Sequence, residues 1–121
     1  MSEKTSGERA EAAACDLLRD CGYEIVARNW RTRRGEIDIV ARDGPVLAMV
    51  EVKARSGQAY GRPEEAVDRA KQRRIVAATR AFLAATGCSL AVRFDVVTFL
   101  DGAPRLFRDA FQAGDECSHD S

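Results

Sequence analysis

The sequence has little of what zinc-binding, membrane-spanning or secreted proteins need. Among its 121 residues are one histidine and four cysteines, and no two cysteines form a C-x-x-C pair. A zinc site is therefore not expected, and Cys15, Cys21 and Cys88 are predicted to be small core or boundary residues with reduced thiols. The longest uncharged apolar run, residues 45–50, is far shorter than the roughly 18 residues of a membrane span. The polar N-terminus does not predict a secretory signal, so we expect a cytoplasmic protein without a membrane partner.

An excess of one charge sign is also missing. Nineteen Lys and Arg balance nineteen Asp and Glu, which at first argues against a nucleic-acid partner, because binders of phosphate are usually basic. However, four acidic residues and no Lys or Arg follow Arg108, so residues 1–108 carry an excess of four positive charges. These acidic residues are Asp109, Asp115, Glu116 and Asp120. Neutrality therefore does not exclude nucleic acid, and we expect deletion of the acidic end to tighten DNA binding at low salt.

Hydrophobic periodicity predicts a small α/β domain with a mixed sheet flanked by helices, in the order α-β-β-β-α-β-β. Helices are predicted over residues 6–21, ended by Gly22, and over residues 63–85, begun by Pro63. Strands are predicted over residues 23–30, 36–42, 46–54 and 90–100, with residues 105–111 as a short edge strand or turn. Residues 46–54 are apolar on both faces except at the end, which indicates a central strand. We expect one domain over residues 1–111 and a disordered acidic tail over residues 112–121.

Three charged residues stand within or at the end of the most apolar strands: Asp38, Glu51 and Lys53. Because strand side chains alternate, Glu51 and Lys53 share one face, and the predicted hairpin brings Asp38 near Glu51. Two such carboxylates resist burial unless a cation compensates them, and Mg²⁺ prefers oxygen ligands. Lys53 could then stabilise the charge that develops on a phosphate. The pattern predicts metal-dependent phosphodiester hydrolysis; a solvated ion pair at the strand ends is the alternative.

Several motifs in the same order resemble the YraN family of bacterial proteins, which is similar to endonucleases of the PD-(D/E)xK type, including archaeal Holliday-junction resolvases. The resemblance covers about residues 7–108 and rests on Asn29-Trp-Arg31, Gly35-Glu-Ile-Asp-Ile-Val-Ala41, Val50-Glu-Val-Lys-Ala-Arg55, Gly61 with Pro63, and Lys71. It implies a restriction-endonuclease-like three-layer fold with Asp38, Glu51 and Lys53 as the D…ExK residues. It also implies the Val52 carbonyl as a further ligand of Mg²⁺ or Mn²⁺. It implies no particular substrate, and it leaves a homodimer open because junction-cutting relatives act as dimers.

The first predicted helix offers two further carboxylates. Glu8 fits a capping box with Thr5, and it points roughly 135° away from the apolar stripe, whereas Glu11 points roughly 75° away. The family pattern E-x-x-A-x-x-x-L-x-x-x-G-Y also falls on Glu11. Glu11 is therefore predicted to be a catalytic or metal-linked carboxylate, with a plain surface residue as the alternative. Glu36 shares the face of Asp38 and is either a further ligand or the partner of an arginine.

Cations cluster on both sides of the candidate site in the sequence, with aromatic residues among them. The predicted nucleic-acid contacts are Arg31, Arg33, Arg34, Arg55, Lys71, Arg74 and Trp30, and Tyr60 lies in the same region. Arginine and lysine would grip phosphates while a ring stacks on a base; solvated faces are the alternative. Lys71 and Arg74 fall within the apolar arc of their helix, where snorkelling is the alternative to a place at the site. Arg93 and Asp95 are predicted to form a structural ion pair.

The leading hypothesis is a metal-dependent nuclease that acts on DNA, with branched and single-stranded forms as candidate substrates. The alternative is a nucleic-acid-binding module of the same fold without turnover. A third hypothesis is a structural or adaptor domain in which Asp38 and Glu51 pair with arginines alone.

Overall fold

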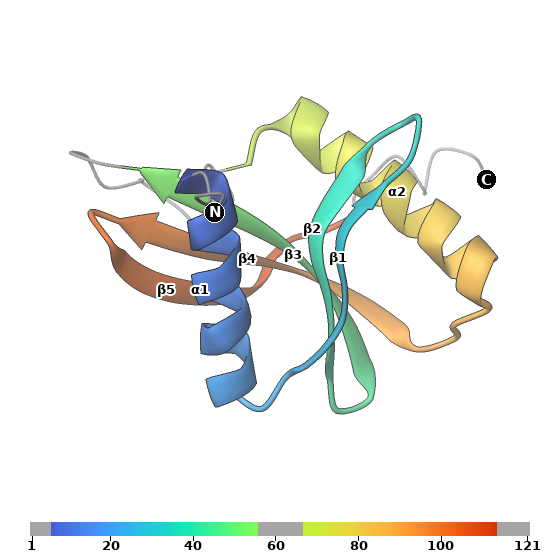
Figure 1. Ribbon diagram of the computed structural model, residues 1–121. Coiled ribbons are helices and arrows are strands. Elements are labelled where there is room, and N and C mark those ends of the chain that lie inside the picture. The colour runs from blue at the N-terminus through green and yellow to red at the C-terminus, as the bar shows by residue number, and fades with distance from the viewer. Residues whose placement is uncertain (1–5, 56–66, 114–121) are drawn as a thin grey trace, which may run out of the picture.

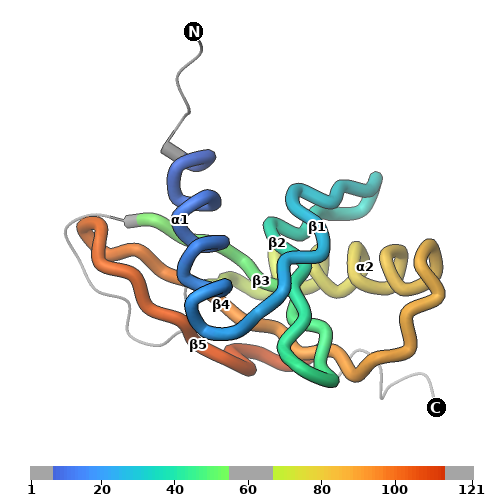
Figure 2. Tube along the Cα trace, turned by 60° about the horizontal axis from the view of Figure 1, so that its bottom comes forward, coloured from blue at the N-terminus to red at the C-terminus, as the bar shows by residue number. Residues whose placement is uncertain are grey.

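Two helices and five strands make up the part of the chain that the computed structural model describes, residues 6–55 and 67–113. Figure 1 shows their order along the chain and Figure 2 shows the same trace turned toward the viewer. The elements are α1 (Ser6–Asp20), β1 (Glu24–Arg31), β2 (Glu36–Asp43), β3 (Val46–Arg55), α2 (Arg69–Thr86), β4 (Ala91–Leu100) and β5 (Ala103–Phe111). This order is the predicted one, and residues 105–111 lie within a full edge strand.

The strands form one mixed sheet in the order β1-β2-β3-β4-β5. The pairs β1–β2, β2–β3 and β4–β5 are antiparallel, whereas β3 and β4 pair parallel, from Val46 opposite Ala91 to Arg55 opposite Leu100. A parallel pair needs a crossover connection, and α2 lies within that connection. The central strand is β3, as its apolar character on both faces predicted.

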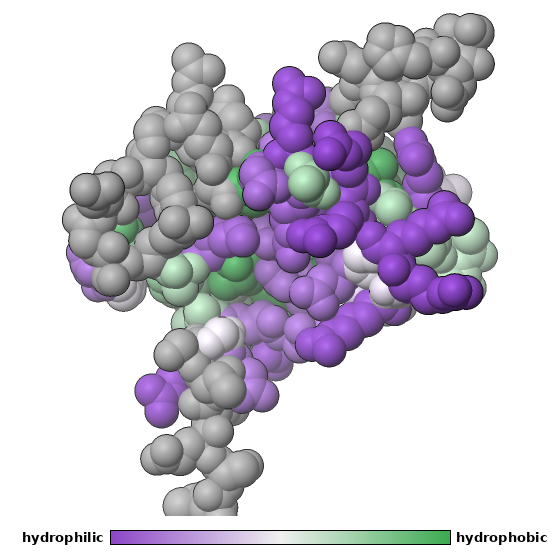
Figure 3. All heavy atoms as spheres, turned by 90° about the horizontal axis from the view of Figure 1, so that it is seen from above, coloured by the Kyte–Doolittle hydropathy of each residue, from purple (hydrophilic) through white to green (hydrophobic). Residues whose placement is uncertain are grey.

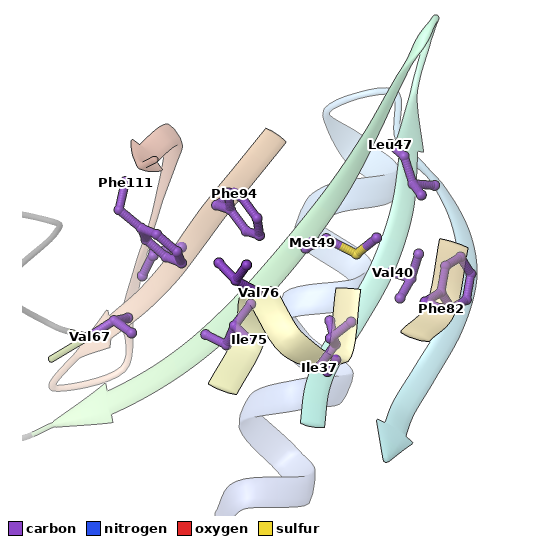
Figure 4. Packing of buried hydrophobic residues seen from close by; sticks show 12 residues of the cluster. Ile37, Val40, Leu47, Met49, Val67, Ile75, Val76, Phe82, Phe94 and Phe111 are labelled. Atoms are coloured by element: carbon purple, nitrogen blue, oxygen red, sulfur yellow. The ribbon is translucent and has the colours of Figure 1, made fainter. Parts of the chain in front are cut away.

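Each helix covers a different face of the sheet and has a hydrophobic cluster of its own, which gives three layers. The α1-side core joins Ala14, Cys15 and Leu18 of the helix to buried residues of the sheet such as Ile39 and Val50. The α2-side core lies on the opposite face, and Figure 4 shows its side chains from β2, β3, β4 and β5 converging on α2. The members that Figure 4 labels are Ile37, Val40, Leu47, Met49, Val67, Ile75, Val76, Phe82, Phe94 and Phe111. The fold is a three-layer α/β fold of the nuclease-like type, as predicted.

The second helix begins later than the sequence predicted. It starts at Arg69 rather than at Pro63, because Asp68 has an extended backbone and its carboxylate accepts a hydrogen bond from the Lys71 N–H at 2.8 Å. This is the ordinary N-cap arrangement. Residues 63–66 lie outside the described part of the chain. The end of the helix is as predicted, with Gly87 in the left-handed conformation at φ 71°.

The cysteine prediction is confirmed in part. Cys15 is buried and Cys88 is half-buried, but Cys21 is exposed, because α1 ends at Asp20 just before it. Of the predicted tail, residues 114–121 lie outside the described part. Ala113 packs against the α2-side core, and the Gln112 amide donates to the Asp109 carboxylate at 2.8 Å. Neither α1 nor α2 is long and apolar enough to span a membrane.

A buried polar cluster ties together the end of the sheet at the β2–β3 turn. The fully buried Asp95 carboxylate receives hydrogen bonds from Arg93 at 2.9 Å, from the Tyr23 hydroxyl at 2.8 Å and from the Asp109 N–H at 2.9 Å. Arg93 also binds the Asp43 carboxylate at 2.9 Å. Burial and the bond to Asp95 raise the pKa of Tyr23 to about 12, so its hydroxyl stays protonated. The predicted structural pair of Arg93 and Asp95 is confirmed.

Candidate active site

The candidate site begins where β2 and β3 separate. Their backbone pairing ends at Ile39 opposite Val50, and one step further Asp38 faces Glu51. There the Val52 N–H donates a hydrogen bond to the Asp38 carboxylate, Oδ2, at 2.8 Å instead of to a backbone carbonyl of β2. A side chain has thus taken the place of a ladder partner, and this contact fixes the Asp38 carboxylate between the two strands.

Glu51 is the most unusual carboxylate in the structure, because it is nearly fully buried and lacks full compensation. Its exposed fraction is 3%, and its Oε1 has no hydrogen-bond partner. Burial raises the pKa of Glu51 to about 8, and the neighbouring Asp38 carboxylate adds to that increase. A buried polar atom without a partner costs free energy. The site therefore favours any cation or donor that can reach Oε1.

Two lysines approach the other oxygen of Glu51. Lys53 Nζ lies 3.5 Å from Glu51 Oε2, and Lys71 Nζ lies 3.6 Å from the same atom. Lys53 is two residues along β3, whereas Lys71 comes from the first turn of α2. Both lower the pKa of Glu51, but their effect is smaller than that of burial and Asp38. The ammonium groups gather on the side of Glu51 that faces α2, and Lys71 approaches the carboxylates rather than snorkelling away from them.

Glu11 reaches the neighbourhood of Asp38 from α1. Its Oε1 accepts a hydrogen bond from the Asn29 amide at 2.7 Å and lies 3.5 Å from an Arg28 nitrogen. Its side chain is 13% exposed, so Glu11 is a half-buried, paired residue rather than a plain surface one. Asn29 has a positive φ of 53°, a conformation that asparagine tolerates better than most residues. The strained backbone at Asn29 and its bond to Glu11 together link α1 to the sheet beside Asp38.

A cavity of about 500 Å³ opens beside Asp38 on the α1 side of the sheet. Glu11, Asn29, Glu36, Asp38 and Val52 all contribute to its wall. Glu51 is not among the lining residues, because its carboxylate points toward the α2 side, where Lys71 lies. The structure therefore brings Asp38 and Glu51 together at the strand junction, and it gathers Glu11, Asp38 and Val52 around the adjoining cavity.

The polar side-chain atoms of Asp38 and Glu51 at the junction are oxygens, the donor type that a hard divalent cation would use. Within residues 6–55 and 67–113, no group of three or more His, Cys, Asp and Glu side chains is arranged to hold a metal ion. The donors present are the oxygens of Asp38 and Glu51, and Glu51 Oε1 is buried without a partner. Mg²⁺ commonly uses one or two carboxylates and keeps several waters. Asp38 and Glu51 would hold such an ion, with the Val52 carbonyl as the further ligand that the resemblance implies.

The predicted nucleic-acid contacts occupy different places. Arg31, Arg33, Arg34, Lys71 and Arg74 line one cavity on the α2 side, next to Glu36. Trp30 instead packs against Phe82 of α2, with ring centroids 5.4 Å apart and the rings at 80° to each other. Part of the Trp30 ring therefore belongs to the α2-side core. The side chain of Arg55 and the whole of Tyr60 lie outside the described part of the structure.

Some residues of the site were not identified from the sequence alone. Asn29 was noted only as part of a motif, although asparagine is a common residue at positive φ and could have indicated a special backbone position. The sequence offers Glu36 two roles, a further ligand or the partner of an arginine, and the structure pairs it with Arg31 at 3.4 Å and with Lys71 at 3.9 Å. The hypothesis that Asp38 and Glu51 pair with arginines alone is wrong, since Glu51 pairs with lysines and Asp38 binds the Val52 N–H.

The three-layer fold, whose β2–β3 hairpin carries Asp38, Glu51 and Lys53, places the chain among α/β proteins with a nuclease-like fold. Residues 10–99 match the model of the uncharacterised protein family UPF0102. The chain therefore belongs to UPF0102, the YraN family, and the predicted resemblance is confirmed.

Curated relatives from several bacteria support this membership. A UPF0102 protein of Symbiobacterium thermophilum is 48% identical over 88% of this chain and 96% of its own length. One from Anaeromyxobacter dehalogenans is 48% identical over 93% of this chain and 88% of its own. One from Lachnoclostridium phytofermentans is 44% identical over 93% of this chain and 98% of its own.

Proposed function

We propose that the protein is a metal-dependent nuclease that hydrolyses DNA phosphodiester bonds with Mg²⁺ or Mn²⁺ at Asp38 and Glu51. The observation that carries this proposal is the buried Glu51, which has an unpartnered Oε1 beside a second carboxylate. A structural role would favour full pairing of both oxygens or replacement by an apolar residue. An incompletely paired carboxylate at this position is better explained by a ligand that binds there.

The reaction adds water across a phosphodiester. The water oxygen forms a bond to phosphorus, the bond from phosphorus to one ester oxygen breaks, and a proton ends on the departing oxygen. A divalent cation supplies Lewis-acid polarisation of a phosphoryl oxygen and lowers the pKa of a water. Asp38, held by the Val52 N–H, and Glu51 would hold this cation.

The lysines and Glu11 have separate roles in this proposal. Lys53 places a positive charge next to Glu51, where it can stabilise the charge that develops on the phosphoryl group. Lys71 lies between Glu51 and Glu36 and can contact a substrate phosphate. Glu11, held by Asn29, lines the cavity beside Asp38 and can orient a water there.

A second candidate function is a nucleic-acid-binding module without turnover. The observation that favours it is that Lys53 and Lys71 already lie within 3.6 Å of Glu51 Oε2. Two internal ammonium groups could stabilise the carboxylate in the absence of a metal ion. In this case the same fold would retain its basic surface and bind DNA without cutting it.

The test uses purified protein with duplex, single-stranded and four-way-junction DNA, with MgCl₂ or MnCl₂ and with EDTA. We expect metal-dependent products that disappear in Asp38→Asn and Lys53→Met but persist in Asp16→Asn, an exposed surface control. Binding of all proteins without any product would reject the enzyme and support the binding module. The mass of the protein–DNA complex, measured in the same samples, tests whether a homodimer acts on the substrate.

A further inference from the structure

The turn between β1 and β2 is held rigidly by one threonine. The Thr32 hydroxyl donates to the Gly35 carbonyl at 2.9 Å and accepts from the N–H groups of Arg34 and Gly35, both at 3.1 Å. The Thr32 N–H also donates to the Gly35 carbonyl at 2.8 Å. The backbone that carries Arg33 and Arg34 is therefore fixed before any ligand arrives.

The same turn is pressed against the first half of α2. A methyl group on Gly35 would lie 2.8 Å from the carbonyl carbon of Arg74 and 2.9 Å from its Cβ, closer than real Cβ contacts allow. Glycine is thus needed here for close approach of two backbones. Figure 1 shows the tip of the β1–β2 hairpin reaching α2. Side chains from the turn and from α2 consequently keep a fixed spacing.

Between the turn and α2 lies a cavity of about 340 Å³ with a strongly positive lining. Five cationic side chains and one carboxylate, that of Glu36, contribute to the wall. The cations are Arg31, Arg33, Arg34, Lys71 and Arg74. Figure 3 looks onto the end of the molecule that carries this turn, where hydrophilic side chains predominate among the coloured atoms. Arginine forks match phosphate oxygens, so this lining suits a phosphate group.

The Glu36 carboxylate contacts two of the cations in this cavity that an external phosphate could also contact. Its Oε2 lies 3.4 Å from Arg31 Nε, and its Oε1 lies 3.9 Å from Lys71 Nζ. The Glu36 side chain is 44% exposed, so it can move toward solvent. Lys71 meanwhile contacts Glu51 as well, and it therefore connects this cavity to the candidate active site.

We propose that the β1–β2 turn and α2 form a preformed subsite for one phosphate of a nucleic-acid strand, and that Glu36 occupies the subsite in the free protein. This inference deepens the proposed function and rests on it for the identity of the strand. The phosphate would neighbour the one at Asp38 and Glu51, because Lys71 borders both places. Release of Glu36 from Arg31 and Lys71 accompanies binding of the strand.

The experiment measures binding in EDTA, so that turnover plays no part. A fluorescein-labelled single-stranded oligonucleotide is titrated by anisotropy at several salt concentrations with the wild type, Glu36→Gln and the double variant Arg33→Gln/Arg34→Gln. We expect Glu36→Gln to bind about threefold to tenfold more tightly at low salt, because a competing charge is removed. The double variant should bind about tenfold or more weakly, and its salt slope should fall by about 0.7, the value for one single-strand phosphate contact.

Arg42→Gln is the matched control, because Arg42 is an exposed arginine at the other end of β2 that donates to the Gly44 carbonyl. Gly35→Ala, checked for folding by its urea midpoint, should weaken binding by separating the turn from Arg74. The subsite is rejected if Glu36→Gln does not bind more tightly, if the double variant matches Arg42→Gln, or if the wild type does not bind. Cleavage is measured separately with MnCl₂. If the protein cuts DNA but these binding tests fail, only the subsite proposal is rejected. If the binding tests succeed but the protein does not cut DNA, the subsite proposal stands and the nuclease proposal is rejected.

Discussion

The Val52 N–H donates a hydrogen bond to the Asp38 carboxylate at 2.8 Å across the gap between β2 and β3. The uncharged amide oxygen of an asparagine at position 38 could accept the same hydrogen bond. Asp38→Asn can therefore remove the negative charge and leave this structural contact in place. Asp38→Asn thus tests the role of the charge alone, whereas a substitution by alanine would also remove the hydrogen bond.

Asp38→Asn should keep the fold and lose the metal. The asparagine oxygen can accept the bond from Val52, so the urea midpoint should stay close to that of the wild type. Loss of a negatively charged ligand should weaken Mn²⁺ binding by about 100-fold or more. Calorimetric titration with MnCl₂ measures this, with Asp16→Asn as the control. Equal Mn²⁺ affinity in Asp38→Asn and wild type would exclude Asp38 as a ligand.

The stability of the metal-free protein should fall as pH rises. The pKa of Glu51 is raised from 4.5 to about 8, so between these values the folded state binds a proton that the unfolded state has lost. Stability then decreases from about pH 5 to pH 8, by an amount on the order of 3 kcal/mol for a shift of this size. Asp38, Lys53 and Lys71 face Glu51, and the two lysines limit the effect.

Glu51→Gln should remove this pH dependence, because glutamine stays neutral throughout. Thermal melts in EDTA at pH 5, 6.5 and 8 compare the two proteins, and the difference between their melting temperatures should shift in favour of the variant as pH rises. Addition of MnCl₂ at pH 8 should stabilise the wild type but not Glu51→Gln. Parallel pH profiles for both proteins would contradict the assigned pKa.

Substitution of Lys53 and substitution of Lys71 should change different kinetic constants. Under the proposed function, Lys53→Met would remove the cation assigned to the reacting phosphate, and it should lower kcat by about 100-fold or more with little change in KM. Lys71→Met would remove a proposed contact on the strand, so it should mainly raise KM and the Kd for DNA in EDTA. Steady-state cleavage kinetics with MnCl₂ and the anisotropy titration separate the two effects. Identical losses in kcat for both variants would show that both lysines serve the chemical step.

The polar cluster around Asp95 should matter for stability alone. Asp95→Ala leaves Arg93 without its main partner and should reduce the free energy of unfolding by about 3–5 kcal/mol. Tyr23→Phe removes one hydroxyl from the cluster and should cost about 1–2 kcal/mol. Urea unfolding measures both. In Tyr23→Phe, Mn²⁺ affinity should equal that of the wild type; a clear loss would show that the cluster is coupled to the metal site.

Much of the fold and the centre of the site could be predicted because they depend on local patterns. Alternation along β3 predicts Lys53 on the face of Glu51, and the antiparallel hairpin predicts Asp38 opposite Glu51. Alternation does not hold throughout β2, since Ile37 belongs to the α2-side core and Ile39 to the α1-side core. The hairpin between these strands is short, which leaves little freedom in their register. The three-layer arrangement followed from the resemblance and is confirmed.

Other features depend on contacts that no local pattern contains. The sequence predicts a helix start at Pro63, whereas α2 begins after Asp68, whose carboxylate accepts the capping bond from the Lys71 N–H. The partners of Glu36 depend on where α2 crosses the sheet, since Lys71 is distant from it in the sequence. The packing of the Trp30 ring against Phe82 likewise depends on where α2 lies.

The parallel pairing of β3 with β4 has a consequence for the order of folding. The β2–β3 hairpin needs only a short loop and can form early, whereas Val46 meets Ala91 only after a long loop through α2 has closed. Lys71 reaches Glu51 by the same closure, so the early hairpin brings two carboxylates together before that ammonium arrives. Protonation at low pH should relieve the repulsion between these carboxylates in the hairpin. In stopped-flow experiments, the folding rate of the metal-free wild type should therefore increase more on lowering the pH than the folding rate of Glu51→Gln does.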